Sequence, residues 1–262
     1  MSHSLRTLVG CAALAAGLWV VTAAAADDAP PELSKESYKK AADADLKFLQ
    51  TRLADLAKNQ AAGNKLAPGQ IQPALGVALL LSVYGDALGD ANLKADAVKV
   101  AEAINKKDFK GADELAKKLA VKPGSGKPGA LPSPLKTEAM LAAVMSPFRS
   151  GAVGGLNIDR DIKDMTKNMN PTKIDPAAVE ILAARSAVIN AYGFHHPNEK
   201  ASVKADNKKK WEQWSTSSVD LSKQIAAEAS KGKTADEKKL KTMLTTLNAR
   251  CTDCHNAFRD DD

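Results

Sequence analysis

The C-terminal end of this chain combines an apolar helical pattern with a pair of cysteines. From Leu240 to Phe258, apolar residues recur at steps of three and four, which predicts an amphipathic helix with one buried stripe. Cys251 and Cys254 both belong to this stripe, and His255 follows directly. Because residues three apart lie on the same side of a helix, we expect both thiols to face the core of a helical protein.

Residues 251–255 read Cys-Thr-Asp-Cys-His, the attachment signal for c-type haem. Two thiols at this spacing can form thioethers to the two vinyl groups of one porphyrin. The imidazole of His255 is then placed beneath the ring as the proximal iron ligand. The motif therefore predicts one covalent haem c, held by Cys251 and Cys254 and ligated by His255.

Two other uses of paired cysteines fit this sequence less well. A redox-active disulfide at this spacing normally lies in a βαβ setting, and no strand pattern is visible. A structural zinc site needs four ligands, and the other histidines are His3, His195 and His196. Apart from Cys251 and Cys254, the only cysteine is Cys11, close to the N-terminus.

The composition favours helices and a folded core. Of the 262 residues, 44% are hydrophobic and only 4% aromatic, with many alanines, lysines and leucines. Such a chain is long enough for one or two domains and suits helices better than sheets. The net charge is +6. The lysines are spread over solvated faces without interleaved aromatics, which argues against nucleic-acid binding but allows docking of an acidic redox protein.

Residues 1–26 have the pattern of a secretory signal peptide, with Arg6 before the apolar stretch 8–21 and small residues at 24–26. We therefore expect a periplasmic or otherwise exported protein that begins at Asp27. The alternatives are a lipoprotein signal ending at Cys11 and an uncleaved anchor. No later segment is expected to be long or apolar enough to span a membrane.

The remaining chain predicts an all-α fold. A Pro- and Gly-rich loop is expected at 122–134. The motif-bearing helix should be capped by Thr234, with Glu237 completing a capping box. The preceding helices are expected at 34–61, 72–88, 93–121 with a break near Asp108, 135–147, 159–169, 176–192 and 202–230.

The two halves of the chain resemble each other in sequence. Residues 73–84 align with 176–187 and residues 94–96 with 204–206, while 143–149 take the place of 254–259. This predicts tandem four-helix-bundle-like units: a haem-less domain at 27–150 and a haem domain at 151–262. Chance similarity between alanine-rich helices is the alternative, and the domain boundary then falls in the loop at 122–134.

A Cys-x-x-Cys-His motif on the last of several amphipathic helices, followed by Asn-Ala-Phe-Arg, resembles the cytochrome c′ family (class II c-type cytochromes). The resemblance covers residues 157–262 and implies a four-helix bundle around the haem. It implies that Arg259 is the basic residue beside the proximal histidine and that Arg185 matches an arginine of the family's first helix. That register directs Ile189 to the distal face of the haem. It is also compatible with a homodimer, and the upstream half has no counterpart in the family.

Several functional readings remain, and the first two differ in the sixth ligand of the iron. If Ile189 covers the distal face, the iron is five-coordinate and the resemblance implies binding of a diatomic gas such as nitric oxide or carbon monoxide. If a side chain ligates it, the site is suited to electron transfer with a redox partner protein; the candidates are Met165, Met169, His195 and His196.

A haem enzyme and a haem-bearing docking module of a larger redox complex are the further alternatives. An enzyme such as a peroxidase would want a distal acid–base residue over an open iron, and nothing in the sequence directs one there. We expect an electron carrier with no catalytic step of its own.

Overall fold

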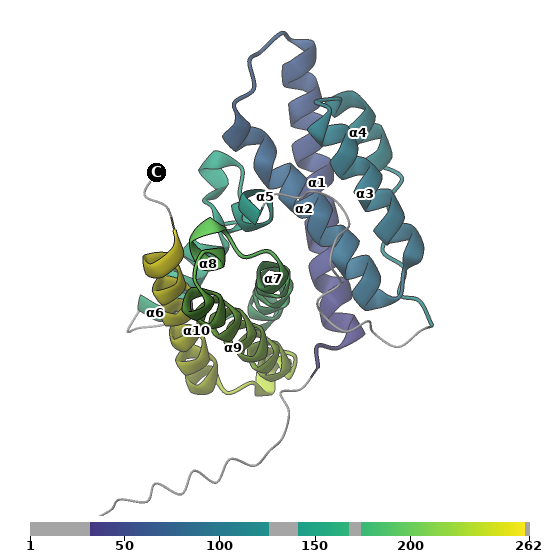
Figure 1. Cartoon of the computed structure of the whole chain (residues 1–262). Helices are drawn as coiled ribbons and strands as arrows, with labels where there is room; N and C mark the ends of the chain where they lie inside the picture. The colour runs from purple at the N-terminus through teal and green to yellow at the C-terminus, as the bar shows by residue number, and fades with distance from the viewer. Residues whose placement is uncertain (1–31, 126–140, 168–173, 260–262) are drawn as a thin grey trace, which may run out of the picture.

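The computed structural model describes residues 32–125, 141–167 and 174–259, and every regular element in them is a helix (Figure 1). The all-α prediction is confirmed for this part of the chain. The predicted signal peptide, most of the loop at 122–134 and the start of the helix expected at 135 lie outside the described residues.

Four helices form the first group. They are α1 (Lys35–Ala61), α2 (Pro68–Leu88), α3 (Ala91–Asn105) and α4 (Phe109–Ala116), and each packs against the next, with α4 closing onto α1. The expected break near Asp108 is confirmed, because this residue caps α4 by accepting a hydrogen bond from the Gly111 amide.

Helix α2 is apolar around its whole circumference and lies in the core. Among the described residues it is the one helix long and apolar enough to cross a membrane, which corrects the expectation that no segment after the leader has such a composition. Because 78% of its apolar window is buried inside the protein, α2 has the surroundings of a core helix.

The second group carries the cysteine motif. Helix α10 (Glu237–Phe258) packs against α6 (Ile158–Lys167) and α9 (Ala205–Ala229), and α9 packs most extensively against α7 (Pro176–His195). The short elements are α5 (Leu141–Met145), the 3-10 turns η1 (Ser146–Phe148), η2 (Gly151–Val153) and η3 (Gly232–Thr234), and α8 (Glu199–Ser202).

The helix expected at 202–230 is α9, and a short helix that the sequence pattern did not indicate, α8, precedes it. The side chain of Asn198 caps α8 by accepting a hydrogen bond from the Ala201 amide, and a bend follows before α9 starts at Ala205. Helix α7 continues to His195, three residues beyond its predicted end. A turn with two histidines therefore lies at the junction of α7 and α8.

The predicted Thr234 cap of α10 is wrong. Thr234 lies in the turn η3, and Asp236 caps the helix by accepting a hydrogen bond from the Lys239 amide at 3.0 Å. The buried carboxylate of Glu228 on α9 holds this connection: it accepts from the Asp236 amide at 3.0 Å and pairs with Lys231 at 2.8 Å and Lys239 at 3.1 Å.

We expect acid to weaken this connection. The Lys231 ammonium, the Asp236 amide and Lys239 lower the pKa of Glu228 to about 2, from 4.5 for an unperturbed glutamate. A carboxyl whose pKa is lowered by folding stabilises the folded state above its unfolded pKa, and this stability is lost as the pH falls from about 4.5 to about 2. Chemical denaturation across this range should show a smaller loss in Glu228→Gln. The variant Glu237→Gln, at an exposed carboxyl, should behave like the unaltered protein; an unchanged acid response in Glu228→Gln would contradict the prediction.

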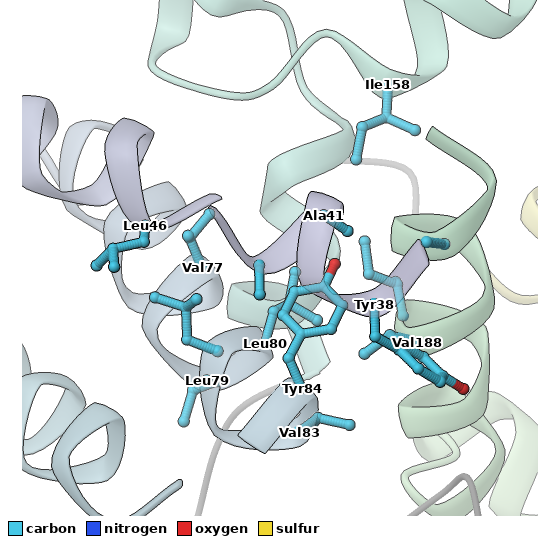
Figure 2. Packing of buried hydrophobic residues seen from close by; sticks show 14 of the residues in the cluster. Tyr38, Ala41, Leu46, Val77, Leu79, Leu80, Val83, Tyr84, Ile158 and Val188 are labelled. Carbon is cyan, nitrogen blue, oxygen red and sulfur yellow. The ribbon is translucent and has the colours of Figure 1, made fainter. Parts of the chain in front are cut away.

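One apolar cluster extends through both groups of helices. Figure 2 shows side chains from both groups in it, with Tyr38 of α1, Tyr84 of α2 and Val188 of α7 close together. Helix α1 packs against α7, and α5 packs against both α2 and α7. The two groups therefore share a continuous core.

The packing of the helices indicates a different correspondence between the two halves of the chain than the sequence alignment does. Helix α4 packs against α1 and α3 as α10 packs against α6 and α9, so α4 has the place in the first group that α10 has in the second. The sequence alignment sets residues 143–149 opposite the end of α10. In the structure these residues lie in α5, in η1 and at the residue that follows η1, and both α5 and η1 pack against α2.

A buried ion pair joins the two groups. Arg185 of α7 donates to Asp45 of α1 at 2.6 Å, and Tyr84 of α2 donates to the same carboxylate at 3.2 Å. Burial raises the pKa of Asp45, and the guanidinium of Arg185 opposes that shift. The carboxylate of Glu180 on α7 adds a second link, since it accepts hydrogen bonds from Ser37 and Lys40 of α1.

Candidate functional site

Helix α10 presents the cysteine motif through its apolar stripe. Phe258, which follows the motif, is buried. The stripe residues before the motif are also buried, and they are Leu240, Met243, Leu244 and Leu247. Cys251 and Cys254 are half-buried free thiols on the same stripe. The predicted stripe and its inward direction are therefore confirmed.

The two cysteines have different neighbours. Cys251 packs against the main apolar cluster. Cys254 packs against a smaller cluster of Ala201, Trp211 and Phe258, which Leu141 of α5 also contacts. A residue of the predicted first domain thus contributes to the surroundings of Cys254, which the sequence pattern did not indicate.

The two tryptophans of α9 pack around the end of α10. The Phe258 ring meets Trp211 at 5.4 Å and Trp214 at 5.5 Å, both in edge-on geometry. The Trp211 indole also donates to the Gly193 carbonyl of α7 at 2.7 Å. These contacts lock α7, α9 and α10 together beside Cys254.

The surroundings of both thiols disfavour the thiolate form. Burial raises the pKa of Cys251 to about 12 and that of Cys254 to about 11. The motif also lies in the last two turns of α10, where the carbonyl end of the helix dipole disfavours a thiolate. Reactive redox cysteines have the opposite surroundings, at helix N-termini or beside cations.

His255 is exposed near the end of α10, and two charged residues of α6, Asp159 and Lys163, act on it. Desolvation of its ring lowers its pKa, as does the charge of Arg259, while Asp159 of α6 acts in the opposite direction. Asp159 and Lys163 also influence the thiol of Cys251. Arg259 ends the helix, and its amide donates to the His255 carbonyl at 2.9 Å.

The turn between α7 and α8 is tied to the end of α10. The side-chain amide of Asn198 donates to the Phe258 carbonyl at 2.6 Å, and the Lys200 ammonium donates to the Arg259 carbonyl at 2.9 Å. These carbonyls have no partner within the helix because α10 ends there. Neither Asn198 nor Lys200 belongs to a recognisable motif, so only the structure identifies their role.

The two histidines of this turn differ in burial. His195 is the last residue of α7 and is exposed, whereas His196 stacks on the buried ring of Tyr192 at 4.1 Å. Burial lowers the pKa of His196, and the neighbouring His195 adds to that shift. The Nε2 atom of His196 is buried and has no hydrogen-bond partner among the described residues.

The other predicted residues lie farther into the second group. Ile189 is fully buried in the main cluster on α7. Arg185 is engaged with Asp45 and lines a cavity of about 260 Å³ between α1, α6 and α7. Met165 also lines this cavity, and Met169 lies outside the described residues.

The chemistry of the donor set fits a covalently attached haem. The two free thiols lie on one face of α10, and the imidazole of His255 follows the second of them. Within residues 32–125, 141–167 and 174–259, no three His, Cys, Asp or Glu side chains gather in a group that could hold a metal ion by themselves.

The chain was compared with protein-family models, with curated proteins and with solved structures, and none of the three comparisons found a match.

Proposed function

We propose that this protein is an exported monohaem c-type cytochrome that transfers electrons through one covalent haem c. The observation that supports this most strongly is the position of the motif. Cys251 and Cys254 lie on the inward stripe of a helix that is packed on two sides, and His255 stands next to them.

In this proposal Cys251 and Cys254 hold the porphyrin and His255 ligates the iron. The bound haem supplies a one-electron redox centre, and the protein tunes it through its ligands and the polarity of its surroundings. The aromatic cluster of Trp211, Trp214 and Phe258 excludes water near Cys254. Arg259 supplies a positive charge beside the imidazole.

The redox-dithiol alternative is less well supported. Its motif belongs at the start of a helix after a strand, whereas here it ends a helix in a described chain without strands. The haem interpretation places no such demand on the fold, because it needs only two thiols on one helix face and an adjacent imidazole.

The wider organisation remains part of the proposal. Tandem helical units, of which only the second carries haem, are supported by one shared feature: α4 packs against α1 and α3 as α10 packs against α6 and α9. We propose a redox partner protein in the exported compartment, an assignment to the cytochrome c′ family for the second unit, and no catalytic step by the protein itself. Neither a homodimer nor a larger redox complex is needed for this function.

Haem attachment can be tested by mass and colour. The full chain should be produced in a host that matures c-type cytochromes and, as a control, in the same host without the maturation system. After denaturation, the mature protein should retain the mass of one haem on a chain that starts at Asp27, and it should be reduced and reoxidised reversibly. A colourless product with the mass of the bare polypeptide in the competent host would refute the proposal.

In the gas-binding alternative, Ile189, which is fully buried in the apolar core on α7, would cover the iron. An aliphatic side chain over the iron leaves the sixth position open to a diatomic ligand. Rapid formation of a carbonyl adduct by the reduced protein would support this function, and the absence of an adduct would support the electron carrier.

A further inference from the structure

We infer that His196 is the second axial ligand of the haem iron, opposite His255. This inference rests on the proposed function and deepens it, because it selects one residue among the four candidates for the sixth ligand. Three observations carry it. His196 lies at the same end of the bundle as the motif, its buried Nε2 atom has no hydrogen-bond partner among the described residues, and its ring stacks on that of Tyr192.

The structure sets His196 at the same end of the bundle as the motif. Asn198, two residues after His196, donates to the Phe258 carbonyl, three residues after His255. Since an α-helix rises about 1.5 Å per residue, His255 lies only about 4.5 Å back along α10 from this hydrogen bond. Both histidines are therefore within one helical turn of a direct contact between their segments.

Helix α10, which bears His255, and helix α7, which ends directly before His196, suit a shared cofactor. Helices α7 and α10 both pack against α9 (Figure 1), and the Trp211 and Trp214 contacts fix α9 to each of them. Cofactors in helix bundles are commonly held by side chains from facing helices. Helices α7 and α10 are thus both fixed to α9 at the end of the bundle that carries the motif.

Within the described part of the chain, the buried Nε2 atom of His196 lacks the hydrogen-bond partner that a buried polar atom normally has. Buried polar atoms in proteins are hydrogen-bonded with few exceptions, and an exception asks for a reason. The Nε2 atom of His196 is one of these exceptions among the described residues. Coordination to iron would satisfy it, because neutral imidazole is a common metal ligand through this nitrogen.

The surroundings also hold the imidazole in place. Its ring lies nearly parallel to that of Tyr192, with an interplanar angle of 18°. The backbone amide of His196 donates to the Gly193 carbonyl, which also accepts the Trp211 indole. A ligand supported in this way has a fixed ring orientation before any metal binds.

The competing candidates among the described residues, His195 and Met165, lack this combination. His195 is exposed and meets Phe194 edge-on. Met165 lines the cavity between α1, α6 and α7, whose lining includes neither cysteine of the motif nor His255. Ile189, which would cover an open sixth position in the gas-binding alternative, lies on α7 seven residues before His196, about two turns away.

The test is the spin state of the iron in purified, matured protein. Absorption and electron paramagnetic resonance spectra should show a low-spin iron with two imidazole ligands in the unaltered protein. The His196→Ala variant should become high-spin and bind carbon monoxide when reduced, and added imidazole should restore its low-spin spectrum. The matched control, His195→Ala, should retain the low-spin spectrum. Circular dichroism and covalent haem content identify variants that fold.

The outcomes separate this inference from the proposed function. The assignment of His196 would be overturned if the unaltered protein were high-spin, or if the His196→Ala variant stayed low-spin without added imidazole. In either case, the presence of covalent haem would leave the cytochrome proposal intact. If the His196→Ala variant fails to fold, the His196→Met variant is measured instead. Its spectrum should change from that of two imidazole ligands to that of one histidine and one methionine. An unchanged spectrum would overturn the assignment of His196. Absence of covalent haem in every variant would overturn both.

Discussion

Replacing Cys251 and Cys254 together by alanine is expected to abolish covalent haem attachment while leaving the helical content unchanged. Both thioethers are lost, so haem should no longer survive denaturation with the polypeptide. Helix α10 should still form, because alanine is the best helix former and Leu240, Leu244 and Phe258 still bury the stripe. Mass spectrometry after denaturation and far-ultraviolet circular dichroism measure the two quantities.

The matched control for this variant is Thr252→Ala with Asp253→Ala. These two residues lie between the cysteines, are exposed and leave the Cys-x-x-Cys-His spacing intact. The control should therefore carry the same amount of haem as the unaltered protein. Full haem content in the double cysteine variant, or none in the control, would contradict the assignment of the two thiols.

Replacing Asp45 by alanine is expected to destabilise the folded protein by about 3–5 kcal/mol, as removal of one partner of a buried ion pair does. Asp45 is fully buried, and only 15% of the Arg185 side chain is exposed. Without the carboxylate, the guanidinium stays in the interface between α1 and α7 without a counter-charge, and the Tyr84 hydroxyl loses its acceptor. Denaturant-induced unfolding would measure the change in free energy.

Two further variants show whether the ion pair is the cause. Asp96→Ala removes one partner of the exposed pair with Lys99 and should change stability by less than about 1 kcal/mol. Asp45→Leu combined with Arg185→Met replaces both buried charges by apolar groups and should recover most of the lost stability. Equal losses in Asp45→Ala and Asp96→Ala would show that burial of the pair contributes nothing.

The role of Arg185 illustrates how a family resemblance and a structure can point to different partners. The resemblance to cytochrome c′ relates Arg185 to an arginine of the haem-binding bundle. In the structure its guanidinium pairs with Asp45, a residue 140 positions earlier in the chain. Its observed contact joins the two helical groups, and the haem-binding role implied by the resemblance stays a prediction.

The amino-acid sequence by itself determined the helices and the candidate site. The three- and four-residue spacing of apolar side chains predicted the stripe of α10 and its inward direction, and Asp108 predicted the break before α4. The haem interpretation depends on five consecutive residues, 251–255. All of these signals connect residues within two turns of a helix, where spacing alone sets which side chains lie together.

The tertiary structure alone decided which distant residues meet. The Asp45–Arg185 pair, the Asn198 contact with the end of α10 and the buried Nε2 of His196 have no local pattern in the chain. The cap of α10 was missed for a similar reason, because Glu228 of α9 holds the loop in which Asp236 becomes the cap. Such contacts arise only when helices pack, since packing chooses among many side chains that local spacing treats as equivalent.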